Sequence, residues 1–221
     1  MHMSPPLFIL AAVGLFLSTN AFDARATGSS PRCSPSGSVT VAESSEARVY
    51  RKRKSSTLHF ACWKRTGKTK LLDKPSSGIT YFGRPAISLA GSVLVSGAIE
   101  VPEAIDTESD TFVFVEDLRA SLAGGPGVPS NGFSFSLFGV GGIAAKPNGS
   151  FAYIECPSSG VDSPCSEGRQ EPFKVYRVTA SRQPKPKRLD RSRGIEPSSL
   201  TVSGSRLRWT KYGKRYSASL P

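Results

Sequence analysis

Alternating apolar and polar residues recur along the chain in short runs, each joined to a second run by a glycine-containing turn. Residues 87–95 (ISLAGSVLV) align without a gap on residues 200–208 (LTVSGSRLR), and a looser copy runs through residues 143–154 (IAAKPNGSFAYI). An alternating run, a tight turn and a second alternating run predict a β-hairpin. Recurrence of the same hairpin predicts that one sheet unit is used several times along the chain.

The other alternating runs add strands to these units, and we expect about four sheets of three to four short strands. In the first unit we place strands at residues 48–51 and 57–63, with Ser56 in the position of the turn glycine. Residues 39–41 are either an additional edge strand of this unit or the outer strand of the fourth. Further runs lie at residues 111–115, 133–138, 173–178 and 215–220. No segment shows sustained helical periodicity, so the predicted fold is all-β and antiparallel.

Repeated antiparallel sheets favour a small β-propeller-like repeat domain over residues 39–221, in which neighbouring sheets bury each other's faces. A β-sandwich is the alternative, because it also uses short alternating strands separated by turns. The two architectures differ in whether the units repeat radially or divide into two packed layers.

Two stretches resemble known proteins. The turn and strand at residues 148–154 (NGSFAYI), followed by residues 173–176 (FKVY), resemble the strand pair of bacterial periplasmic propellers of the TolB or WD40-like type. The ending from Ile195 to Trp209, with the Tyr212-Gly213-Lys214 turn, resembles exported proteins of high-GC actinobacteria. The resemblance implies a non-catalytic fold that binds other molecules.

The first residues predict export from the cytoplasm. An apolar run at residues 7–17, too short to span a bilayer, precedes Ala24-Arg25-Ala26, so we expect a signal peptide over residues 1–26, with an uncleaved anchor as the alternative. Residues 27–38 are rich in Ser, Pro and Gly and predict a flexible lead-in. No later run is apolar for long enough to span a membrane. The predicted location is secreted or extracytoplasmic.

The chain has four cysteines, Cys33, Cys62, Cys156 and Cys165, which allow three pairings in an oxidising compartment. Cys156 and Cys165 flank a short loop and are the natural first pair, which leaves Cys33 with Cys62. Metal binding is the alternative, but the spacings match no CxxC pattern and His59 is the single histidine after residue 26. We predict two disulfides, no metal and no cofactor.

The net charge of +12 favours an anionic partner. We expect an anionic cell-envelope polymer or a protein, and not nucleic acid. Cations and an aromatic ring are interleaved in the first unit, as in a groove for an anionic polymer. The candidate binding residues are Arg51, Lys52, Arg53, Lys54, Trp63, Lys64 and Arg65. The alternative is that these residues are solvated turns and edge positions.

Catalytic motifs are weak. His59 alternates with Leu58 and Phe60 and predicts an exposed strand position, and no Gly-x-Ser-x-Gly elbow supplies a nucleophile. The carboxylates of residues 100–116 include Glu100 and Glu116, a candidate pair for glycan hydrolysis. Residues 106–110 (DTESD) are either calcium ligands or a solvated loop. We therefore predict a secreted, non-catalytic binding or scaffold domain, with an envelope glycan-active enzyme as the alternative.

Overall fold

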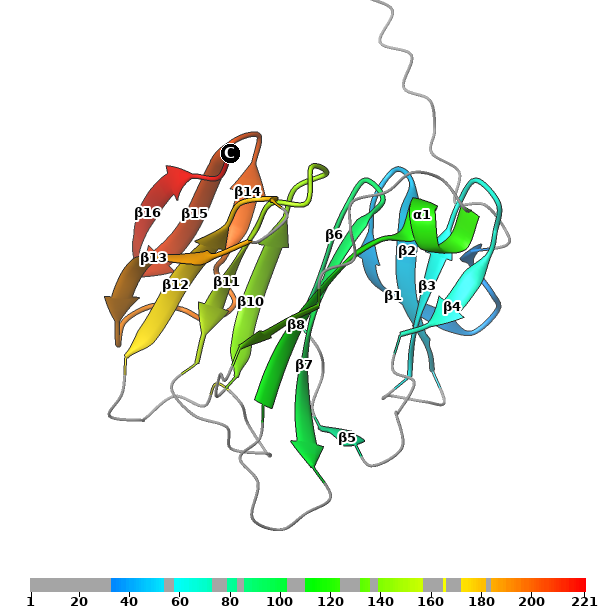
Figure 1. Ribbon diagram of the computed structural model, residues 1–221, viewed down its shortest axis with the longest axis horizontal. Helices are drawn as coiled ribbons and strands as arrows, with labels where there is room; N and C mark the ends of the chain where they lie inside the picture. The colour runs from blue at the N-terminus through cyan, green and yellow to red at the C-terminus, as the bar shows by residue number, and fades with distance from the viewer. Residues whose placement is uncertain are drawn as a thin grey trace, which may run out of the picture.

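Four antiparallel sheets follow one another along the chain in the computed structural model (Figure 1). The structure describes residues 33–53, 58–72, 79–82, 86–102, 110–123, 132–135, 139–156, 165, 172–181 and 184–221. The prediction of an all-β, antiparallel protein is confirmed. The predicted signal peptide lies outside the described residues, among which no helix is long and apolar enough to cross a membrane.

Each sheet is formed by strands that are close in sequence. Sheet A contains β1 (Ser38–Glu43), β2 (Ala47–Lys52), β3 (His59–Trp63) and β4 (Thr69–Leu71). Sheet B contains β5 (Ile79–Phe82), β6 (Ile87–Ala90), β7 (Val93–Pro102), β8 (Asp110–Asp117) and β9 (Gly132–Phe135). Sheet C contains β10 (Val140–Ala145), β11 (Phe151–Glu155), β12 (Phe173–Val178) and β13 (Pro186–Ser192). Sheet D contains β14 (Thr201–Ser203), β15 (Arg206–Lys211) and β16 (Lys214–Ser219).

The repeated sequence forms the same hairpin in sheets B and D. Strands β6 and β7 end on the pair Ala90↔Val93, and β14 and β15 end on the pair Ser203↔Arg206. The turn glycine has a φ of +57° in both hairpins, a conformation that glycine adopts without a steric penalty. The predicted equivalence of the two segments is therefore confirmed.

In the first unit the sequence predicted that the strands at residues 48–51 and 57–63 form the hairpin equivalent to β6–β7. This prediction is wrong, because the equivalent hairpin lies one strand earlier. The first hairpin of sheet A is β1–β2, whereas Ser56 lies outside the described residues. The Ser44 hydroxyl accepts a hydrogen bond from the Ala47 amide at 3.0 Å and donates one to the Gly91 carbonyl at 2.6 Å, so the first turns of sheets A and B are adjacent. Residues 39–41 pair locally with β2 and not with sheet D, because closing a short turn costs less entropy than closing most of the chain.

Neighbouring sheets pack face to face, and a separate apolar cluster fills each interface. Val49, Trp63 and Leu94 belong to the cluster between sheets A and B. Two further clusters lie between sheets B and C and between sheets C and D. One strand of each sheet lines the inside of this stack, and these strands lie next to one another in the order β1, β6, β10 and β14. The sheets thus form an arc with sheets A and D at its ends (Figure 1), and a propeller-like closure remains a prediction.

A short helix, α1 (Leu118–Ala123), follows β8 and packs on β3. The Asp117 carboxylate accepts a hydrogen bond from the Arg119 amide at 2.9 Å and caps the start of the helix. Leu118 is fully buried in the interface between sheets A and B. The helix therefore covers the edge of that interface and does not change the fold class.

Candidate functional site

The described chain begins at a disulfide that fastens the lead-in to sheet A. Cys33 is bonded to Cys62 on β3, and Cys156 is bonded to Cys165, as the spacing predicted. Cys33 is fully buried, and the amide of Ser38 donates to the Pro35 carbonyl at 3.0 Å. The last residues of the predicted flexible lead-in are therefore fixed against β3. Both bonds are compatible with the predicted extracytoplasmic location.

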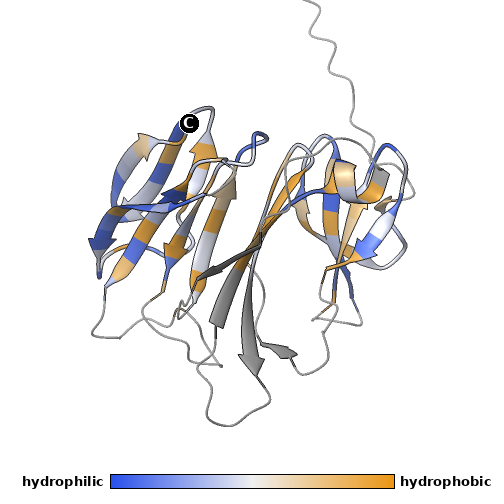
Figure 2. Cartoon of the chain, in the orientation of Figure 1, coloured by the Kyte–Doolittle hydropathy of each residue, from blue (hydrophilic) through white to orange (hydrophobic). Residues whose placement is uncertain are grey.

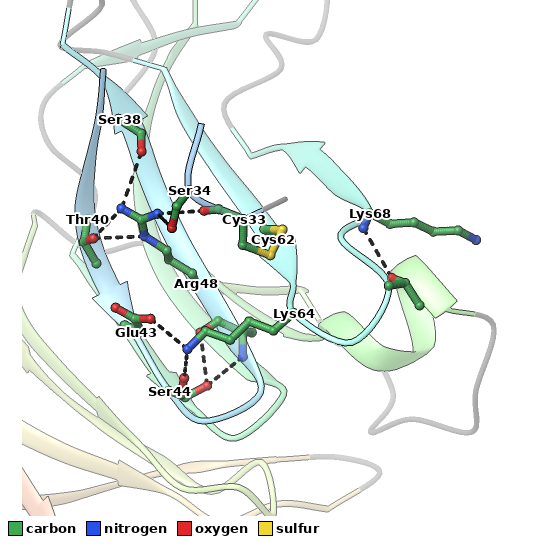
Figure 3. Close-up of a disulfide and its surroundings, with 12 residues drawn as sticks. Cys33, Ser34, Ser38, Thr40, Glu43, Ser44, Arg48, Cys62, Lys64 and Lys68 are labelled. Atoms are coloured by element: carbon green, nitrogen blue, oxygen red, sulfur yellow. Dashed lines mark hydrogen bonds and ion pairs between the residues drawn. A yellow bond between two sulfur atoms is a disulfide. The ribbon is translucent and has the colours of Figure 1, made fainter. Parts of the chain in front are cut away.

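Arg48 holds the same segment from the neighbouring strand (Figure 3). Its side chain is buried and donates hydrogen bonds to Thr40 Oγ1 at 2.9 and 2.6 Å, to the Cys33 carbonyl at 2.7 Å and to the Ser34 hydroxyl. All of these acceptors are neutral oxygens. A buried guanidinium needs its donors satisfied, so Arg48 acts as a structural clamp for the lead-in.

Two aromatic rings extend this covered face of sheet A. Tyr50 stacks on Phe60 with ring centroids 5.5 Å apart, and the Lys52 ammonium lies 5.5 Å from the Phe60 centroid. Burial raises the pKa of Tyr50, and the charge on Arg48 opposes this rise. Lys52 is therefore a predicted binding residue that is both exposed and in contact with an aromatic ring.

The structure divides the predicted basic groove between the two ends of sheet A. Arg51 pairs with His59 at one end of the β2–β3 ladder, and Ala47 pairs with Trp63 at the other. The four-residue difference corresponds to roughly 13 Å along the strand. Arg51, Lys52 and Arg53 lie at the first end, and Lys64 and Arg65 follow the second; Lys54 lies outside the described residues.

The second end offers little binding surface. Trp63 is only 4% exposed and packs between sheets A and B, and its indole N–H has no hydrogen-bond partner in the part of the chain described. Lys64 forms an ion pair with Glu43 at 2.7 Å and donates to the Ser44 carbonyl at 2.6 Å (Figure 3). Arg65 is exposed in the turn before β4. The ring and cations of the predicted groove are therefore not brought together.

The backbone positions of the two residues proposed for glycan hydrolysis are also separated. Glu100 pairs with Asp110 at one end of the β7–β8 ladder, and Leu94 pairs with Glu116 six residues away, roughly 20 Å along the strand. Glycosidases place their two carboxyl groups within about 10 Å of each other. Glu116 forms an ion pair with Lys70 at 2.5 Å. The geometry thus argues against this pair.

The structure corrects the predicted position of His59, and most of the predicted calcium-binding segment lies outside the described residues. His59 is only 4% exposed, so the predicted exposed position is wrong. It lies on the central strand β3, where sheet B and α1 cover the face shared with Trp63. Residues 106–109 are not among the described residues, and in the described part no group of three or more His, Cys, Asp or Glu side chains could hold a metal.

Sheet D presents a cationic surface that sequence reasoning missed. Figure 2 shows bands of hydrophilic residues along β15 and β16; exposed and buried residues alternate at the start of β15, and most of β16 is exposed. Leu207 and Trp209 point toward sheet C, whereas Arg206 and Arg208 are exposed on the opposite face. The alternation of arginine with Leu207 and Trp209 in β15 is the sequence signal that could have predicted this exposed face. We call this exposed side the outer face of sheet D.

Cross-strand pairing arranges the outer face in three rungs. Each rung has one arginine beside one or two hydroxyl groups. The rungs are Ser203–Arg206–Ser219, Thr201–Arg208–Ser217 and Thr210–Arg215. The three arginines are exposed, and none of them has an ion-pair or hydrogen-bond partner among the described residues.

The opposite side of sheet D contains the one acidic contact between β13 and this sheet. Asp190 accepts a hydrogen bond from Trp209 Nε1 at 3.0 Å and forms an ion pair with Lys211 at 3.0 Å. Burial alone would raise the pKa of Asp190, but the bonds from Lys211 and Trp209 outweigh burial and hold the pKa below its ordinary value. The hydrogen bond to Asp190 raises the pKa of Lys211.

These features define a class: a disulfide-bonded, all-β protein built from four successive antiparallel sheets, with a cationic outer face at one end. No protein-family model, curated protein or solved structure matches the chain. The resemblance to TolB or WD40-like propellers therefore remains a prediction.

Proposed function

We propose that this is a secreted, non-catalytic binding or scaffold protein whose partner is an anionic polymer of the cell envelope. The observation that supports this function most is the unpaired positive charge. The net charge is +12, and five of the described carboxylates, including Glu116 and Glu155, already form ion pairs within the protein. The unpaired cations consequently dominate the field that an approaching molecule meets.

The packing also supports a rigid binding protein. Two disulfides and three interface clusters fix the sheets, so the backbone that carries an exposed side chain keeps its position without a ligand. Little backbone conformational entropy is then lost on binding. A protein partner is the second possibility, and the test below separates the two.

The test is retention of the protein of residues 27–221 on isolated cell envelopes across a salt series. We expect strong retention at low salt and a steep fall as salt rises, because charge contacts to a polyanion are screened and release counterions. Retention that does not change with salt would favour a specific protein partner. Absence of retention at low salt would contradict the proposed function.

A further inference from the structure

We infer that the outer face of sheet D binds a linear phosphodiester polymer of the cell envelope, with one anionic group on each of its three rungs. This inference rests on the proposed function and adds the surface and the chemistry of the ligand. It places the binding site at the opposite end of the molecule from the basic residues predicted from the sequence.

The arginines of the outer face lie at regular intervals along sheet D. Arg206 and Arg208 are two residues apart on β15, and Arg215 lies beside Thr210, two residues further along. Successive rungs are therefore roughly 7 Å apart. The positions are held by the ladder and by the burial of Leu207 and Trp209 on the other side of β15. A regular row of cations fits a ligand whose charges also repeat in a line.

The outer face of sheet D has an excess of positive charge. The sequence from Leu200 to Pro221 contains no Asp or Glu, so sheet D has no carboxylate side chain of its own. Asp190 is occupied by Lys211 and Trp209 on the other side of the sheet. Glu196 is exposed beside the third rung, where its amide donates to the Thr210 carbonyl at 3.1 Å, but its carboxylate forms no ion pair among the described residues. The three arginines repel one another, because no described carboxylate forms an ion pair with any of them. A bound polyanion removes this repulsion.

Each rung combines an arginine with one or two hydroxyl groups. A guanidinium donates two parallel hydrogen bonds to an oxyanion, and it does this better than the ammonium of lysine. A carboxylate has two oxygens, and the guanidinium occupies both. A phosphodiester also has ester oxygens, and the hydroxyls of Ser203, Ser217 and Ser219 can donate to these or to the same anionic oxygens. The rungs therefore favour phosphodiesters over carboxylates.

The experiment compares two variants that each lose three positive charges. The first is Arg206→Gln, Arg208→Gln and Arg215→Gln on sheet D; the second is Arg53→Gln, Arg65→Gln and Lys68→Gln on sheet A. All six side chains are exposed, and thermal unfolding checks that both variants fold. The probe is an immobilised synthetic glycerol phosphate oligomer, measured across a salt series.

We expect the sheet D variant to bind at least tenfold more weakly at low salt. The slope of log affinity against log salt should become shallower by about 2, because three phosphate contacts are lost. The sheet A variant should keep most of the binding. Equal loss in both variants, greater loss in the sheet A variant, or loss in neither would overturn the inference.

Arg206→Lys, Arg208→Lys and Arg215→Lys keep the charge and remove the guanidinium, and we expect clearly weaker binding than in the wild type. Wild-type affinity in this variant would overturn the role of the arginine geometry. Polyglutamate and single-stranded oligothymidylate are the competing ligands. Polyglutamate bound as tightly as the glycerol phosphate oligomer would overturn the preference for phosphodiesters, and tighter binding of the oligothymidylate would overturn the assignment to an envelope polymer.

The same variants separate this inference from the proposed function. If the wild type is not retained on envelopes, the proposed function fails. If the wild type is retained and the sheet D variant is retained equally, the proposed function stands and the sheet D site is wrong.

Discussion

Sheets A and D occupy the two ends of the arc, and each turns one face away from its neighbour (Figure 1). On sheet A the segment after Cys33 covers that face, and Arg48 is buried beneath it. On sheet D the corresponding face is exposed, and its arginines have no partner among the described residues. The same residue type thus clamps a segment at one end of the molecule and meets solvent at the other.

The difference shows that the position of an arginine in a strand does not decide its role. Arg48 and Arg206 both alternate with buried apolar residues on their strands. What distinguishes them is a covalent crosslink that brings an additional segment over sheet A.

The largest expected effect is the loss of the disulfide on sheet A. Cys33→Ser with Cys62→Ser should lower the free energy of unfolding by about 3–4 kcal/mol, since the bond closes a 29-residue separation. Urea denaturation monitored by tryptophan fluorescence measures it. The matched variant, Cys156→Ser with Cys165→Ser, opens a separation of only 9 residues and should cost about 1 kcal/mol less. An equal or larger cost in the second variant would contradict the importance of the sheet A clamp.

The second effect concerns the buried arginine. Arg48→Met keeps the aliphatic stem but leaves the Cys33 carbonyl and the Thr40 hydroxyl without their donors, so we expect a loss of about 2 kcal/mol. Arg53→Met, at an exposed turn position of the same sheet, should stay within about 0.5 kcal/mol of the wild type. Chemical denaturation of both variants makes the comparison, and similar values would mean that Arg48 does not clamp the lead-in.

The third effect is the pH dependence of the contact between β13 and sheet D. The pKa of Asp190 is lower in the folded protein than its ordinary value, so its contribution to stability is complete above that ordinary value and is lost as pH falls through the folded pKa. Asp190→Asn should therefore be less stable than the wild type near neutral pH. The difference should shrink on acidification below the ordinary Asp pKa of about 3.9. Denaturation curves of both proteins near neutral pH and below about pH 3.9 measure the difference in the free energy of unfolding. A difference that does not change with pH would rule out this linkage.

The smallest expected effect is on the exposed face itself. The Arg206→Gln, Arg208→Gln and Arg215→Gln variant should change the free energy of unfolding by less than about 0.5 kcal/mol, because these side chains are exposed and have no hydrogen bond or ion pair among the described residues. A small gain is consistent with reduced repulsion. A loss of more than about 1 kcal/mol in thermal or chemical unfolding would show that the arginines support the sheet.

Local pattern predicted the strands and hairpins well. The Gly-Ser pairs at Gly91 and Gly204 favour two-residue hairpin turns through their local conformation. The alternation of apolar and polar residues then determines which residues share a face of the sheet. The disulfide pairing followed from the short spacing of Cys156 and Cys165. Each of these features depends on residues close together in sequence.

Burial and proximity were not predictable in the same way. His59 and Trp63 become buried because sheet B and α1 pack on β3, and no local pattern records that contact. The cations of sheet A are close in sequence, but a strand carries them to opposite ends of the sheet. The arginines of sheet D were overlooked because they are separated by apolar residues that point inward, and so form no run of like charge.

The attachment of Cys33 to β3 also determines how sheet A would respond to mechanical load. A pull on the residues before Cys33 passes through the disulfide into Cys62, on a strand paired on both sides with β2 and β4. Force therefore bypasses the edge strand β1, which would otherwise be peeled from the sheet one bond at a time. Loading the middle of the sheet requires several backbone hydrogen bonds to break together.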